Sequence, residues 1–250
     1  MRFWKSALLG LSLVFWLSAT AWSEPVAVRF PEGVTRAFPA VRSLEGKTLA
    51  FGDFVQVARE DRVQSRLLFR FKDGSIHDET VVYSQRAVFR LESYRLIQRG
   101  PSFPESLEVS IDRQTGAYSV RHRGDEDSPE EVVEGKFEVP DDAYNGMLTL
   151  IVKNLPPGAG DTVSLVAFTP KPRVVKLKLT PTAEEPILLN ELPMKATRYV
   201  IKPELGLFAS LLLFDLPSLR CWILPGEAPA FLKAEGPLYF MGPVWRIEPF

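Results

Sequence analysis

Apolar and polar residues alternate with a period of two through much of the first half of the chain, from Leu49 to Arg123. Successive side chains of a β-strand point to opposite faces, so this period is typical of strands with one buried face. The pair Asp73-Gly74 separates two such runs and predicts a tight hairpin, and Thr115-Gly116 separates another two. Short strands joined by short turns, with no helix between them, indicate an antiparallel meander.

One helix is predicted after Pro140. Asp141 and Asp142 give it an acidic first turn, which the helix dipole favours. The segment 154–158, which contains two prolines and a glycine, ends it. Its apolar stripe consists of Met147, Leu148, Ile151 and Leu155.

Strands resume after this helix. They are predicted over 162–169, 174–180, 196–202, 221–224 and 244–248, with a helical turn over 227–232. The proline-rich pieces near Pro181, Pro186 and Pro193 are predicted to be loops. The sequence therefore predicts a single all-β or β-rich domain over 24–250, a curved antiparallel meander (half-barrel) with one or two plugging helices.

Residues 1–23 have the pattern of a secretory signal peptide. Arg2 and Lys5 precede an apolar run from Ala7 to Leu17, which is too short to span a bilayer. Small residues suited to cleavage follow, and we favour cleavage after Ser23 over cleavage after Ala21. An uncleaved anchor is the alternative interpretation. The chain is expected to be exported to a bacterial periplasm, with the extracellular space as the alternative compartment.

The charge balance argues against a nucleic-acid partner. Removing residues 1–23 takes away two basic residues and no acidic ones, so the 30 basic and 31 acidic residues of the chain become 28 and 31. A protein that binds nucleic acid needs a basic face to replace the phosphate counterions. We therefore expect no nucleic-acid partner.

The residue types that usually carry chemistry are few. Only two histidines are present, His77 and His122, and neither has partners at the spacing of a zinc site. Both are predicted to lie on the surface, and no metal or other cofactor is expected. Cys221 is the only cysteine, and its strand-like surroundings favour a buried apolar role over a nucleophilic one. Motifs for a nucleophile elbow or a phosphate loop are absent.

The longest apolar run outside the N-terminus is Leu205 to Phe214. It is too short to cross a membrane, so it belongs to the core, covers an apolar cavity as a lid, or forms a membrane-facing tip. Phe103, in the 100–104 loop, is predicted to be exposed and to form a rim contact. The contacts predicted for an apolar ligand are Phe103, Met147, Ile151, Leu207, Phe208, Leu211, Leu212 and Phe214.

The chain as a whole resembles uncharacterised bacterial envelope proteins. The likeness rests on the N-terminal signal, the long meander, the helix after Pro140-Asp141, and the strands ending in Trp222-Ile223-Leu224 and Trp245-Arg246-Ile247. This arrangement is similar to the half-barrel of the periplasmic lipoprotein-carrier and outer-membrane lipoprotein-receptor families. The likeness is one of pattern over most of the mature chain, so no binding residue carries over. It implies a curved sheet wrapped over helices, with acyl chains held between them.

The leading functional hypothesis is non-enzymatic binding or carriage of an apolar or lipidic ligand in the periplasm. The alternative is a structural or partner-binding envelope protein whose core is filled by its own side chains. A hydrolase with catalytic residues dispersed along the chain is the third hypothesis, because triad members need not be close in sequence. A transient contact with the membrane or with an envelope protein is a further expected interaction.

The signal-peptide hypothesis makes a direct prediction. When the full chain is expressed in a bacterium, the exported protein should begin at Glu24, or at Trp22 if the earlier cleavage site is used. N-terminal sequencing or the intact mass of the periplasmic fraction measures this. A protein that keeps Met1 and stays with the membrane fraction would contradict it.

Overall fold

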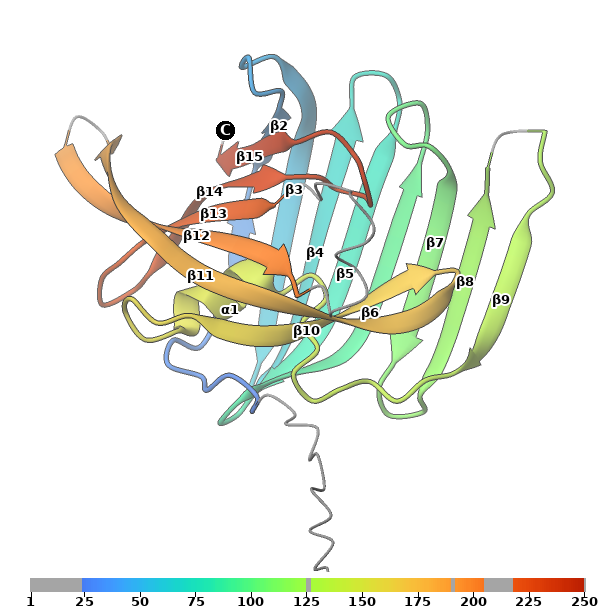
Figure 1. Ribbon diagram of the computed structural model, residues 1–250, viewed down its shortest axis with the longest axis horizontal. Helices are drawn as coiled ribbons and strands as arrows, with labels where there is room; N and C mark the ends of the chain where they lie inside the picture. Colours follow the sequence, from blue (N-terminus) through green and yellow to red (C-terminus); the bar gives the residue numbers. More distant parts are fainter. Residues whose placement is uncertain (1–23, 125–126, 190–191, 205–217, 250) are drawn as a thin grey trace, which may run out of the picture.

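The computed structural model describes residues 24–124, 127–189, 192–204 and 218–249 (Figure 1). These residues form one antiparallel sheet of 15 strands and one helix, α1 (Leu148–Asn154). The strands are β1 (Thr35–Ala37), β2 (Pro39–Arg42), β3 (Thr48–Arg59), β4 (Arg62–Phe71), β5 (Ile76–Gln85), β6 (Phe89–Arg99), β7 (Ser106–Asp112), β8 (Ala117–Arg123), β9 (Glu131–Lys136), β10 (Asp161–Thr169), β11 (Lys171–Leu189), β12 (Leu192–Pro203), β13 (Leu219–Leu224), β14 (Ala230–Gly236) and β15 (Trp245–Pro249).

The prediction of a curved antiparallel meander is confirmed. The strand order is β10-β11-β12-β13-β14-β15-β2-β3-β4-β5-β6-β7-β8-β9, and β1 pairs with β3 beside this path. Every pair of neighbours in this order is consecutive in the chain except β15 and β2. The order ends at β10 on one side and at β9 on the other, so it describes an open sheet rather than a closed ring.

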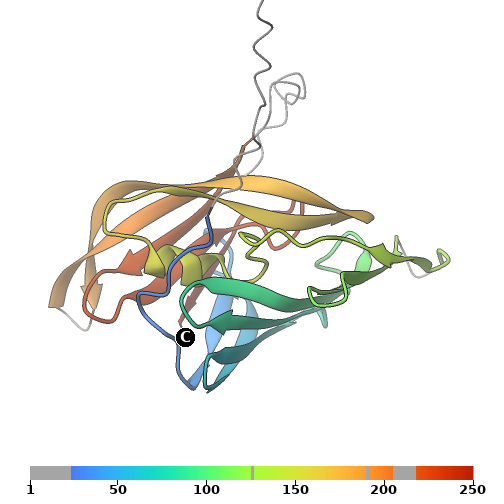
Figure 2. The same cartoon turned by 90° about the horizontal axis from the view of Figure 1, so that it is seen from below.

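Two wings of the sheet enclose the helix. Seen from below, β10 to β14 arch over one side of α1, while β3 to β8 lie on its other side (Figure 2). Leu150, Ile151 and Val152 of α1 are buried between the wings. No helix of the described residues is both long and apolar enough to cross a bilayer.

The two hairpins predicted from glycine-containing turns are present. β4 and β5 are joined at Asp73-Gly74, and β7 and β8 are joined at Thr115-Gly116. Gly74 and Gly116 have φ angles of 88° and 70°, which lie in the left-handed region that glycine adopts without strain.

The proline-rich pieces are not loops. Pro181 and Pro186 lie within β11, and Pro193 lies within β12. β10 pairs with β11 only as far as Leu179, and β12 pairs with β13 only over Thr197–Ile201. Beyond these points each strand has a neighbour on one side only, so a residue without an N–H group is tolerated.

Two further local predictions are wrong. The helical turn predicted over 227–232 is not formed. Residues 230–232 belong to β14, where Ala230 and Phe231 pair with Leu224 and Ile223 of β13. The helix predicted from Asp141 begins only at Leu148.

The apolar run 205–214 lies outside the described residues, so its core, lid and membrane-tip roles all stay predictions.

The residues expected to start that helix instead cover the edge of β10. The Ser164 N–H donates to the Asp142 carbonyl at 2.9 Å, and the Tyr144 N–H donates to the Ser164 carbonyl at 3.0 Å. The Asn145 side chain continues this pairing: its amide donates to the Val166 carbonyl at 2.8 Å and its oxygen accepts from the Val166 N–H at 2.9 Å. A side chain thus takes the place of a neighbouring strand.

Asp142 is held at this edge by charge as well. Its carboxylate is fully buried, accepts from the Ser164 hydroxyl at 2.9 Å and pairs with Lys176 of β11 at 2.7 Å. A buried carboxylate is tolerated when its oxygens are satisfied in this way. The acidic start of the predicted helix is therefore a structural clamp on β10 and β11.

The Asn145 clamp gives a stability prediction. Replacing Asn145 by leucine, which has a similar volume, leaves the Val166 N–H and carbonyl without their partner in a buried position. Each unsatisfied group costs about 1–3 kcal/mol, so we expect Asn145→Leu to lose about 2–6 kcal/mol in urea unfolding. Gln114→Leu, at an exposed turn position, should change stability by less than about 0.5 kcal/mol. Equal effects of the two changes would contradict the clamp.

Candidate functional site

The buried side chains form two separate cores. The helix core gathers around α1 and includes Tyr83, Tyr144, Met147 and Ile151. The aromatic core lies toward the other end of the strands and consists of Val41, Ala50, Phe69, Phe71, Phe103 and Trp245. The strands β3 to β6 run from one core to the other.

Between the cores, one row of side chains on the inner face of β3 to β6 keeps part of its surface exposed. We call it the interior row; its members lie opposite one another across the strands and are Phe54, Leu67, Glu79 and Leu96. All four are half-buried. Because side chains alternate with a period of two, the row shares its face with the buried residues of both cores.

The rows on either side of the interior row are buried. Toward the helix core they are Gln56, Ser65, Val81 and Tyr94, with at most 8% of each residue exposed. Toward the aromatic core, Phe69, His77 and Gln98 are at most 4% exposed. The inner face is therefore filled at both ends, and between the filled ends three apolar residues and one glutamate are only half-buried.

Glu79 is the polar member of the row. The Tyr94 hydroxyl donates to its Oε1 at 2.9 Å. Burial raises the pKa of the Glu79 carboxyl, and the Tyr94 hydrogen bond opposes this rise because it favours the charged form. The pKa of Tyr94 is raised well above 10, because burial and the nearby Glu79 charge both oppose loss of its proton.

Tyr94 also joins the two wings of the sheet. Its ring stacks on Phe168, near the end of β10, with 6.4 Å between ring centroids and an interplanar angle of 6°. Pairs in this geometry are attractive beyond the area they bury. The hydroxyl that holds Glu79 therefore belongs to a side chain that is fixed from the opposite wing.

Gly146, just before α1, makes room for the Glu79 carboxyl. Its φ is 67°. A Cβ atom at this position would lie 3.2 Å from Glu79 Oε1 and 2.4 Å from a methyl group of Val81. A side chain at this position would therefore clash with Val81 and crowd Glu79, so only glycine lets the Glu79 carboxyl pack against this turn.

The predicted ligand contacts are not brought together. Phe103 is 7% exposed and lies in the aromatic core, packed edge to face on Phe71 at 5.5 Å, so its predicted exposure is wrong. Met147 and Ile151 are buried in the helix core with 1% and 0% exposure. The other five, Leu207, Phe208, Leu211, Leu212 and Phe214, lie outside the described residues.

His77 is not a surface residue as predicted. It is 4% exposed, shares the inner face with Glu79, and lies beside Phe69 and Phe103. The Gln98 side-chain amide lies 2.9 Å from Nδ1 and also donates to the Leu238 carbonyl at 2.7 Å. Burial lowers the pKa of His77 to about 4, so the ring is neutral at physiological pH.

His122 and Cys221 have structural surroundings. His122 is half-buried between Glu105 and Glu131, with nitrogen–oxygen distances of 3.6 and 3.2 Å. Cys221 is fully buried, and burial raises the pKa of its thiol to about 12, which keeps it protonated. Among the described residues, no group of three or more His, Cys, Asp or Glu side chains is placed to hold a metal ion.

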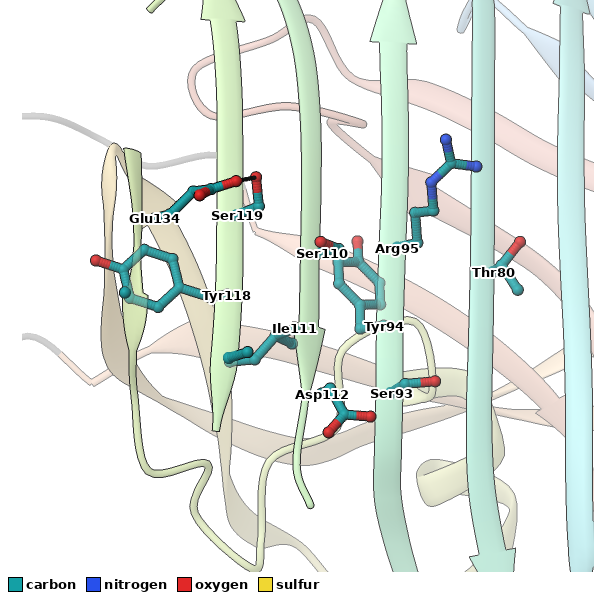
Figure 3. Close-up of a pocket in the computed structure, with 12 residues that line it drawn as sticks. Thr80, Ser93, Tyr94, Arg95, Ser110, Ile111, Asp112, Tyr118, Ser119 and Glu134 are labelled. Carbon is teal, nitrogen blue, oxygen red and sulfur yellow. Dashed lines mark hydrogen bonds between the residues drawn. The ribbon is translucent and has the colours of Figure 1, made fainter. Parts of the chain in front are cut away.

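A second candidate lies on the outer face, where a hollow of about 630 Å³ extends over β5 to β9 (Figure 3). Short hydroxyl side chains form its floor, and the charged side chains beside them are longer. Ser119 donates to Glu134 at 3.4 Å, and Arg95 pairs with Glu108 at 2.7 Å. The row across the strands is Thr80, Arg95, Ser110, Ser119 and Glu134. These groups already bond to each other or face solvent, so the hollow is the weaker candidate.

No family model matches the chain, and no curated protein matches it. Among solved structures, the chain is similar to one described as a beta-barrel-like protein of the domain of unknown function DUF1849 from Brucella abortus. The two share 10% sequence identity, the alignment covers 90% of this chain and 97% of the other, and the TM-score is 0.45.

The buried His77 gives a pH prediction. Its folded pKa of about 4 lies below the ordinary 6.5, so the unfolded chain takes up a proton first as the pH falls. The contribution is fully present above pH 6.5 and is lost between pH 6.5 and pH 4. It amounts to about 3 kcal/mol, from about 1.4 kcal/mol per pKa unit.

We expect urea unfolding of His77→Phe to show a smaller loss of stability between pH 7 and pH 4 than the wild-type protein does. Carboxylates that titrate in the same range contribute equally to both proteins, so the difference isolates His77. An identical pH dependence in the two proteins would show that His77 is not buried in its neutral form.

Proposed function

We propose that the protein binds an apolar or lipidic ligand without converting it chemically, in the periplasm of a bacterium. The observation that carries the proposal is the interior row, a set of half-buried apolar side chains on the inner face between two filled cores. The N-terminal pattern of a signal peptide supports the proposed compartment.

The two cores hold the side chains of the interior row in place. Phe54, Leu67 and Leu96 keep apolar surface exposed on the same face as the cores. Burying such surface is worth about 25 cal/mol per Å², or about 0.8 kcal/mol for each methylene group of a ligand. Because Leu67 packs on the aromatic core and Leu96 on the helix core, the row is held in place before a ligand arrives. Preorganisation lowers the entropy cost of binding.

The resemblance to the periplasmic lipoprotein-carrier half-barrels points the same way. The protein has a curved antiparallel sheet with a helix enclosed by it, and acyl chains lie between sheet and helices in those families. A likeness of fold is weak support for function by itself. It agrees here with the position of the interior row, which lies on the enclosed side of the sheet.

One observation favours the alternative, a structural or partner-binding envelope protein. Met147 and Ile151 of the helix region are completely packed, so the helix core is filled by the chain's own side chains. On this alternative the interior row is a packing irregularity of the inner face, and filling it with a larger side chain has no effect on any ligand.

A matched pair of variants separates the two functions. Leu96 belongs to the interior row, whereas the adjacent Ile97 lies on the outer face between Asp78 and Glu108. We expect the wild-type protein to bind the neutral apolar dye N-phenyl-1-naphthylamine saturably, measured by its fluorescence. Leu96→Trp should weaken binding at least tenfold because the indole occupies the row, and Ile97→Trp should leave it unchanged.

Thermal melting of both variants controls for folding, since overpacking at a half-buried position costs about 1–3 kcal/mol. Native mass spectrometry of the protein purified from a bacterial envelope supplies a second readout, because a bound lipid appears as a defined added mass. Absence of saturable dye binding by the wild-type protein, together with a clean unliganded mass, would favour the structural alternative.

A further inference from the structure

We propose that the Glu79 carboxylate recognises a primary ammonium group, so that the ligand is a cationic amphiphile such as an aminolipid whose apolar part lies along the interior row. This inference rests on the proposed function, because it concerns the same site. It adds the chemical class of the headgroup and the residue that binds it.

Glu79 is the only charged side chain on the inner face of β3 to β6. The inward positions of these strands otherwise carry apolar residues, small residues and neutral polar ones, together with the neutral His77. The buried neighbours of Glu79 on its own strand are His77 and Val81. A lone carboxylate in such surroundings is costly unless it takes up a proton or a group of opposite charge pairs with it.

Asp78, the residue before Glu79, has an ion pair that Glu79 lacks within the part of the chain that the structure describes. Asp78, on the outer face, forms a two-point ion pair with Arg66 of β4, with oxygen–nitrogen distances of 2.8 and 2.6 Å. Asp53 pairs with Arg36 and Glu92 pairs with Arg62 on the same outer face. Glu79, one position away and on the opposite face, has no salt-bridge partner among the described residues.

The hydrogen bonds of Glu79 are also incomplete. An ionised carboxylate accepts about four hydrogen bonds, and within the described residues the Tyr94 hydroxyl supplies one, to Oε1. Oε2 therefore has capacity for a donor that comes from outside these residues. A donor with positive charge fits best, because it satisfies the oxygen and neutralises the buried charge together.

Glu79 packs directly against the Gly146 backbone, where a Cβ atom would lie 3.1–3.2 Å from the carboxyl group. Glu79 as a residue is half-buried, and Gly146 is exposed. Leu67 and Leu96 lie directly beside Glu79 in the interior row. A compact ammonium group at Oε2 thus places an attached hydrocarbon chain against apolar neighbours. A carboxylate headgroup is repelled at the same point.

The test compares ligands of one chain length with different headgroups. We would titrate the full-length protein at pH 8 with dodecylammonium, dodecanol and dodecanoate, each below its micelle concentration, by isothermal calorimetry. We expect dodecylammonium to bind at least tenfold more tightly than dodecanol, and dodecanoate to bind most weakly. Butylammonium should bind at least tenfold more weakly than dodecylammonium, which distinguishes an amphiphile from a free small amine.

Glu79→Gln is the decisive variant. It should bring dodecylammonium to within about threefold of dodecanol while dodecanol affinity stays unchanged, since the shape of the row is kept. Glu108→Gln, which removes a carboxylate from the outer face, should change neither affinity. If both amphiphiles bind the wild-type protein and Glu79→Gln does not reduce the preference for ammonium, the headgroup inference is wrong and the proposed function stands. If no amphiphile binds, the proposed function itself is wrong.

A pH series covers the case in which Glu79→Gln fails to fold. The ammonium preference should fade as the pH falls and Glu79 takes up a proton. The Tyr94 hydrogen bond favours the charged form, so Tyr94→Phe should move this fading to higher pH. The other titratable groups near Glu79 on the inner face, His77 and Tyr94, stay neutral between pH 5 and pH 9. An unchanged pH dependence in Tyr94→Phe would contradict the assignment of Glu79.

Discussion

The pairing of β15 with β2 holds the two ends of the chain in one sheet. Val41 lies opposite Ile247 and Ala40 opposite Glu248, and Arg42 pairs with Glu248 at 2.8 Å. Along the main strand order every other neighbouring pair is consecutive in the chain, whereas this contact closes a loop of about two hundred residues. The entropy cost of closing a loop rises only slowly with its length, so a well-packed pair of strands is sufficient. The aromatic core exists because this pairing brings Trp245 beside Phe71.

The local part of this fold could be predicted from the sequence and the long-range part could not. The alternation of residues and the turns at Asp73-Gly74 and Thr115-Gly116 depend on neighbours in the chain, and they gave the correct fold class. Local sequence predicts loops at Pro181 and Pro186, because a proline interrupts a strand that is paired on both sides. Both prolines lie in β11 beyond its last pair with β10, and local sequence does not give the register of these two strands. Likewise, Asn145 acts as a substitute for a strand, which local helix signals do not reveal.

Part of the candidate site could be predicted from the sequence. Glu79 shares the inward phase of β5 with Val81 and Tyr83, so an acidic residue in a buried phase is visible in the sequence. What makes it unusual is that no arginine faces it, and that depends on the register of β4, β5 and β6. The sequence predicts Phe103 as an exposed rim contact and Met147 as part of the apolar helix stripe facing the same ligand. They belong to different cores, and the residues between those cores are the ones that keep accessible surface.

The open sheet order explains how such a row is kept within a folded protein. Asp142 to Asn145 cover the edge of β10 at Ser164 and Val166, so the backbone groups of these two residues are not free to pair with another strand. The described contact between the wings at this side is instead the stacking of Tyr94 on Phe168. A ring pair contributes about 0.5–1.5 kcal/mol, less than the several hydrogen bonds of a strand ladder at about 1 kcal/mol each. At this side the wings are therefore joined by side-chain packing rather than by a strand ladder, and Tyr94, whose ring makes that contact, also donates the hydrogen bond to Glu79.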